Sequence, residues 1–170
     1  MRVHLEDSPT ELAVAARPPA DQDDAPDLLL VAYLAERAFA IPAVAVERIV
    51  RMVAVTPLPG ASPHVVGVVN VQGAVLPVVD PRPLFGLPTS EPHPDQDLVI
   101  LSAPHRYALW MDRVVDVSPA TRADFQTTRS IGAPGPASLV MRPDGAVIPV
   151  LSVVALDPGP TIHLTRQLAR

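Results

Sequence analysis

Histidines and a few acidic residues are the side chains of this 170-residue chain that acid–base or metal chemistry would use first. The five histidines are scattered and show no metal-ligand spacing: His4, His64, His93, His105 and His163. Asp80 ends an apolar run and Asp112 lies close to Trp110, so either can serve as half of an acid pair. No partner for either is visible in the sequence, and we expect turn or capping roles for both.

Motifs for nucleophilic catalysis and phosphate binding are missing from the sequence. Residues 60–64 (GASPH) do not form a nucleophile elbow, because proline follows the serine and the second glycine is absent. Neither of the two common glycine-rich phosphate-binding patterns occurs. The absence of cysteine excludes a thiol nucleophile, a thiolate zinc site and a disulfide frame. We therefore expect a non-enzymatic protein without metal or cofactor, although a site built from residues far apart in sequence stays open at this point.

The composition favours a packed domain rich in strands and turns. The chain is 48% hydrophobic, and its 22 prolines disfavour long helices because proline blocks helix interiors. A formal net charge of −5 without a basic run argues against a nucleic-acid partner. Residues 53–79 carry no formal charge, but prolines interrupt them, so we expect buried strands and no membrane insertion. The N-terminus lacks the apolar core of a signal peptide, which fits a cytoplasmic protein.

Apolar runs separated by turn residues predict short strands in two blocks. The expected strands are residues 28–33, 38–41, 48–55, 65–71, 74–79, 98–101, 106–117, 138–141 and 146–150. Short helical turns are expected at residues 43–46 and 81–87, and a long loop at residues 121–136. Residues 1–26 are expected to form a flexible tail, and residues 158–170 a tail or short helix.

The two blocks resemble each other. Residues 73–79 (GAVLPVV) match residues 145–151 (GAVIPVL), and residues 37–41 (RAFAI) match residues 105–109 (HRYAL). The spacing is roughly 70 residues throughout, which indicates an internal duplication. Each half is then expected to form a small barrel of about five strands. The two barrels should centre on residues 35–82 and 98–151, with strand exchange at their ends.

Several segments together resemble the CheW-like domain family. They are residues 39–42 (FAIP), 46–50 (VERIV), 57–59 (PLP), 64–73 (HVVGVVNVQG) and 75–80 (VLPVVD). The resemblance covers roughly residues 27–157, is strong over residues 39–80 and is weak after Val117. It implies an all-β fold of two packed five-stranded SH3-like barrels with short helical turns, which agrees with the internal repeat.

The same resemblance implies a chemotaxis adaptor. Members of the family bind the regulatory domain of a CheA-type histidine kinase and the cytoplasmic tip of chemoreceptors. By resemblance, the receptor contact is placed around Val46, Glu47, Gly67, Asn70 and Gln72, with Val46 alternatively a core residue. Kinase contacts are expected on exposed turns and strand edges of each barrel. The alternative is a small unrelated β-barrel that binds a ligand or is an enzyme with a site not visible in the sequence.

Three glycines are predicted to have conformational roles. Gly73 and Gly145 lie where hairpins reverse, where glycine supplies a positive φ without a Cβ clash. Gly67 interrupts an apolar run, which is typical of a bulge or of a close backbone approach.

The sequence departs from the family pattern at Gln72, where an arginine usually precedes the hairpin glycine. In the usual pattern that arginine can pair with the acidic residue at the position of Glu47. Glutamine keeps hydrogen-bonding reach but loses the charge. We expect normal folding and kinase binding with weak or selective coupling to receptors, and the alternative is a neutral surface change.

Overall fold

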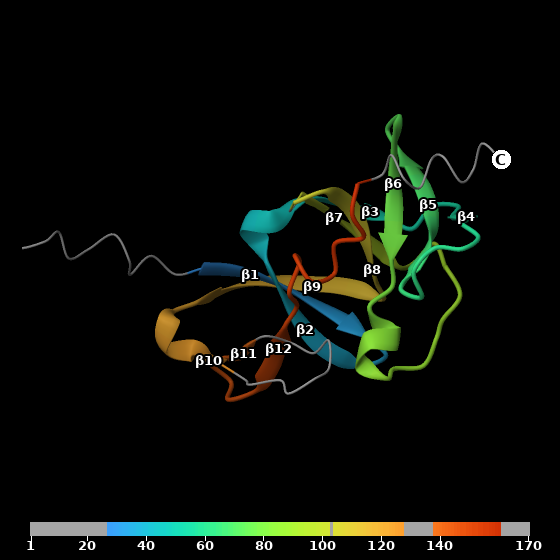
Figure 1. The fold of residues 1–170 in the computed structure, drawn as a ribbon. Coiled ribbons are helices and arrows are strands. Elements are labelled where there is room, and N and C mark those ends of the chain that lie inside the picture. Colours follow the sequence, from blue (N-terminus) through green and yellow to red (C-terminus); the bar gives the residue numbers. More distant parts are fainter. Residues whose placement is uncertain (1–26, 103, 128–137, 161–170) are drawn as a thin grey trace, which may run out of the picture.

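Short strands and 3₁₀ turns make up the computed structural model of the chain, which describes residues 27–102, 104–127 and 138–160 (Figure 1). The strands are β1 (Asp27–Leu34), β2 (Arg37–Pro42), β3 (Val46–Arg51), β4 (Thr56–Pro57), β5 (Val65–Val71), β6 (Ala74–Val79), β7 (Asp97–Ser102), β8 (Arg106–Met111), β9 (Arg113–Ala120), β10 (Phe125–Thr127), β11 (Ser138–Met141) and β12 (Val147–Val150). The 3₁₀ turns are Ala43–Ala45, Arg82–Phe85 and Arg122–Asp124. The predicted all-β class with short helical turns is confirmed.

The strands form two mixed sheets. The first sheet has the order β10-β11-β12-β2-β1-β9, and the second has the order β3-β7-β8-β6-β5-β4. Each sheet therefore has six strands in place of the five predicted for each barrel. Strand pairing leaves two end strands in each sheet, so hydrogen bonds between strands do not close either sheet into a complete barrel. Among the strands that the structure describes, all pairings are antiparallel except two, β12 with β2 and β6 with β8.

The two repeats, predicted to centre on residues 35–82 and 98–151, pair across the sheets, because each repeat gives its first hairpin to the other sheet. The hairpin β1–β2 pairs with β9 and β12, whereas the hairpin β7–β8 pairs with β3 and β6. The two parallel contacts correspond to each other through the repeat: Val150 faces Ala40, and Val78 faces Ala108. The predicted exchange thus involves whole hairpins, which burial on both sides of the exchanged strands stabilises.

The buried apolar side chains gather in three clusters. The central cluster contains residues from strands of both sheets: Leu30, Ala32, Leu34, Phe39, Ile41, Ala45, Val65, Val79, Val99, Leu101, Tyr107, Leu109, Met111, Leu151 and Leu156. A second cluster consists of residues on the second sheet and Met52 directly after β3: Met52, Val69, Leu76, Val78, Leu98, Ile100, Ala108 and Trp110. The third cluster consists of residues on the first sheet: Leu29, Val31, Ala40, Ala120, Val140, Ile148 and Val150. Strands β1, β2, β7 and β8 carry apolar side chains on both faces, which explains their continuous apolar sequence.

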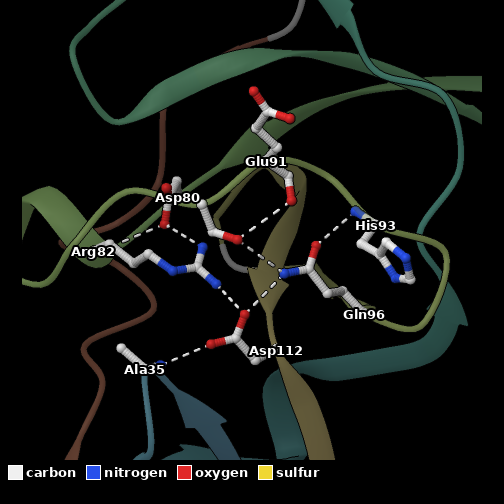
Figure 2. A network of polar contacts seen from close by, with 8 residues as sticks. Ala35, Asp80, Arg82, Glu91, His93, Gln96 and Asp112 are labelled. Atoms are coloured by element: carbon white, nitrogen blue, oxygen red, sulfur yellow. Dashed lines mark hydrogen bonds and ion pairs between the residues drawn. The ribbon is translucent and has the colours of Figure 1, made fainter.

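A buried ion-pair network connects the two sheets (Figure 2). Arg82, which is 1% exposed, donates to Asp80 Oδ1 at 3.0 Å and to the Asp112 carboxylate. Its guanidinium carbon lies 4.6 Å from the centroid of the Trp110 ring. Asp112 also accepts from the Ala35 backbone N–H at 2.7 Å, in the turn between β1 and β2. The two aspartates noted in the sequence therefore share one cation, and Asp112 connects it to the β1–β2 turn of the first sheet.

Local structure follows the sequence prediction in most places. The turn at Gln72 and Gly73 has φ of +52° and +86°, which is typical of a type I′ hairpin turn, and Gly145 has φ of +82°. The predicted loop at residues 121–136 is wrong in its first part, because a 3₁₀ turn and β10 occupy residues 122–127. There Thr121 and Asp124 form a capping box that holds the turn.

Three predicted segments lie partly or wholly beyond the described residues. The tail at residues 1–26 lies outside them, as do residues 161–170 of the predicted C-terminal segment and residues 128–136 of the predicted loop. Residues 157–160 are described and contain no regular structure.

Candidate functional site

The sequence-predicted site residues Glu47 and Gln72 meet in one exposed polar cluster, which we call the Glu47 cluster: Glu47, Arg48, Gln72 and Arg106. Arg106 forms a two-pronged ion pair with Glu47, with Nε–Oε2 at 2.9 Å and Nη2–Oε1 at 2.8 Å. Arg48 donates from Nη2 to Glu47 Oε1 at 3.1 Å and from Nη1 to the side-chain oxygen of Gln72. Glu47 thus contacts Gln72 through Arg48, and its direct charge partner comes from β8.

The charges of the cluster stabilise one another. Hydrogen bonding from the Arg106 guanidinium holds the pKa of Glu47 below its ordinary value, with partial desolvation opposing this and Arg48 adding to it. A two-pronged guanidinium–carboxylate pair also fixes the direction of both side chains. The cluster is therefore an oriented charged surface, suited to recognising a partner.

The local backbone explains why the cluster forms. Strand β3 is an end strand of the second sheet, and its register with β7 shifts between Val46 and Arg48, so Glu47 lies at a bulge. The β5–β6 hairpin supplies Gln72 from its tip, where Asn70 Oδ1 accepts from the Gly73 backbone N–H at 2.8 Å. Asn70 thus stabilises the hairpin turn.

The two remaining predicted site residues lie outside the cluster's hydrogen-bonded network. Val46 is half-buried and packs against the central core, with Leu101 as its β7 partner. Gly67 is buried in β5, where a Cβ atom would lie 2.2 Å from the Thr56 carbonyl oxygen. The predicted bulge and close backbone approach at Gly67 are both present, since the register of β5 with β6 shifts between Val65 and Gly67.

Sequence reasoning missed Arg48 and Arg106. Arg106 lies 59 residues after Glu47, so no local pattern links them. A weak signal exists in the repeat, because Arg106 stands where the first half has Ala38. A charge that replaces alanine at the start of an apolar strand indicates an exposed strand end with its own partner.

The histidines and acidic residues of the described part of the chain do not gather into a metal site. There, no group of three His, Asp or Glu side chains is placed to hold a metal ion. His105 pairs with Asp157 at 3.1 Å and His93 with Asp95 at 3.4 Å, each as a separate pair. The described part of the chain also contains no helix that is long and apolar enough to cross a lipid bilayer.

Comparison with protein families matches residues 28–157 to the CheW-like domain. The chain belongs to the CheW-like domain family. A chemotaxis protein CheW of Rhizobium meliloti (strain 1021) is 31% identical to this CheW-like chain over 106 residues, which span 61% of this chain and 68% of that protein. The scaffolding protein TtCheW of Thermoanaerobacter tengcongensis has a similar fold, with a TM-score of 0.69 and 21% identity over 77% of this chain and 92% of that chain.

Family, sequence relative and fold all agree with the adaptor class. The comparisons support a chemotaxis adaptor or scaffold role for this CheW-like chain. None of them supports the alternative of an unrelated ligand-binding barrel or enzyme.

Proposed function

We propose that this CheW-like chain is a cytoplasmic, non-enzymatic adaptor that couples chemoreceptors to a CheA-type histidine kinase. The observation that carries the proposal is the match to the CheW-like domain over residues 28–157. The adaptor binds the regulatory domain of the kinase and the cytoplasmic tip of the receptor, and it works by holding them together. It neither inserts into the membrane nor binds nucleic acid.

The receptor contact is placed on the second sheet, around the Glu47 cluster. Its supporting feature is an exposed ion pair beside half-buried Val46 at an end strand of the sheet. Charged groups at the rim of an interface steer association and select partners. Asn70 and Gly67 contribute indirectly, because they set the hairpin turn and the path of β5 that carry Gln72.

The kinase contact is placed on the first sheet. Two largely apolar hollows of about 610 and 630 Å³ border β12 there, one lined by Val150 and the other by Val147. Val147 is 49% exposed, and exposed apolar side chains rimmed by polar ones favour protein contacts. An adaptor that presents different surfaces to receptor and kinase can hold both at once.

A three-component binding experiment tests the proposal. The full chain is mixed with the purified regulatory domain of a CheA-type kinase and a receptor cytoplasmic fragment from the same organism, and complexes are separated by size exclusion. We expect each pairwise complex and a ternary complex. Val147→Asp should weaken kinase binding and leave receptor binding intact. Absence of both pairwise complexes with a folded wild-type chain would contradict the adaptor function.

A further inference from the structure

We propose that Arg48 and Arg106 form a docking site for a carboxylate of the receptor tip, and that Arg106 supplies the positive charge that the hairpin lacks at Gln72. The inference rests on the proposed function and names the chemistry of its receptor contact. It makes Arg106 a specificity-determining residue, although it lies on β8 and outside the segments that resemble the family most strongly.

The charge balance of the cluster favours an acidic partner. Its ionised groups are one carboxylate, Glu47, and two guanidiniums, Arg48 and Arg106, so the cluster has a local charge of +1. The whole chain carries a formal net charge of −5. A positive site on an otherwise acidic protein attracts an acidic group to one place and repels it elsewhere.

Free hydrogen-bond donors remain for such a group. Among the described residues, Arg106 Nη1 and Arg48 Nε have no hydrogen-bond acceptor, while the other guanidinium nitrogens bond Glu47 or Gln72. The side chains of Arg48 and Arg106 are 40% and 46% exposed, so an approaching carboxylate can reach them. Charge-assisted bonds from guanidinium to carboxylate are among the stronger contacts available to an interface.

The site is already oriented before a partner arrives. Glu47 holds the Arg106 guanidinium by two hydrogen bonds, which limits the side-chain freedom that binding would otherwise remove. Glu47 is therefore a positioning residue for this contact. Substitution of Glu47 should reduce binding, even though the Glu47 carboxylate itself places a negative charge on the surface that faces an acidic partner.

Gln72 fits this arrangement better than arginine would. Its side-chain oxygen accepts a hydrogen bond from Arg48, and arginine has no acceptor to replace it. An arginine at that position would place a third cation against Arg48 and displace it. Gln72 and Arg106 thus form a matched set, in which the positive charge has moved from the hairpin tip to β8.

Calorimetric titration of the full chain with the receptor cytoplasmic fragment tests the inference. We expect Arg106→Gln to weaken receptor binding about tenfold and Arg106→Lys to weaken it less, because lysine keeps the charge but not the fork. The control Arg113→Gln removes an exposed arginine that lies over the Tyr33 ring on the other sheet, and it should not change receptor affinity. Kinase-domain affinity should be unchanged in all three variants.

A receptor fragment with its tip carboxylates changed to amides identifies the partner group. The tenfold difference in receptor affinity between wild type and Arg106→Gln should disappear with this fragment. Equal receptor affinity of wild type and Arg106→Gln, with both folded by circular dichroism and both binding the kinase domain, would overturn the site. A wild-type chain that binds neither fragment would instead overturn the adaptor function and the site with it.

Discussion

Replacing Arg82 by methionine removes the cation from the buried network between the sheets and keeps most of the side-chain volume. Asp80 is 3% exposed and would lose the cation that pairs with it, which leaves the backbone N–H of residue 82 as a hydrogen-bond donor to its carboxylate. The Asp112 carboxylate is 30% exposed and retains Gln96 and Ala35 as donors, so the free-energy cost at Asp112 is smaller than at Asp80. The main cost is therefore an uncompensated charge at Asp80.

The size of the effect follows from the burial of that charge. Removing one partner of a buried ion pair costs about 3–5 kcal/mol, against a total free energy of unfolding of about 5–15 kcal/mol for ordinary domains. Adding Asp80→Asn to Arg82→Met removes the stranded charge, and we expect the double variant to recover roughly 1–2 kcal/mol.

Urea unfolding measures these free energies. Trp110 is the single tryptophan and lies beneath Arg82, so its fluorescence reports on this region, while far-ultraviolet circular dichroism reports on the whole sheet structure. The matched control is Arg51→Met, which removes a largely exposed guanidinium from Asp97; because the Asp97 carboxylate keeps the Val114 backbone N–H as a donor, we expect a cost of about 1 kcal/mol or less. A loss for Arg82→Met no larger than that of Arg51→Met would refute the reasoning.

Three other substitutions give checkable results. Gly67→Ala places a Cβ 2.2 Å from the Thr56 carbonyl oxygen, so a lower urea midpoint equivalent to about 1–3 kcal/mol is expected, and an unchanged midpoint would contradict the close approach. Glu36 has φ of +64°, so Glu36→Gly should raise the melting temperature; a decrease would count against strain there. Because hydrogen bonding to Arg106 lowers the pKa of Glu47, the stability difference between wild type and Glu47→Gln should be fully present above pH 4.5 and shrink as pH falls below it. A pH-independent difference would argue against the ion pair.

The sequence determined the local structure and the family of this protein. The hairpin at Gln72 and Gly73, the helical turns after Pro42 and Pro81, and the close approach at Gly67 depend on backbone preferences of a few adjacent residues. Such preferences can be recognised without knowing the partners of a strand. The repeat also indicated two related halves, and the two corresponding parallel contacts agree with it.

The tertiary structure decided how the halves exchange their hairpins and which charges meet. Strands with apolar side chains on both faces carry no signal of which sheet they join, so the boundaries drawn at residues 35–82 and 98–151 followed chain order. Arg82 meets Asp112 from 30 residues away, and Arg106 meets Glu47 from 59 residues away. A side-chain ion pair acts over a few ångströms in space and leaves no spacing rule in the sequence, so only the packing of the sheets could bring these charges together.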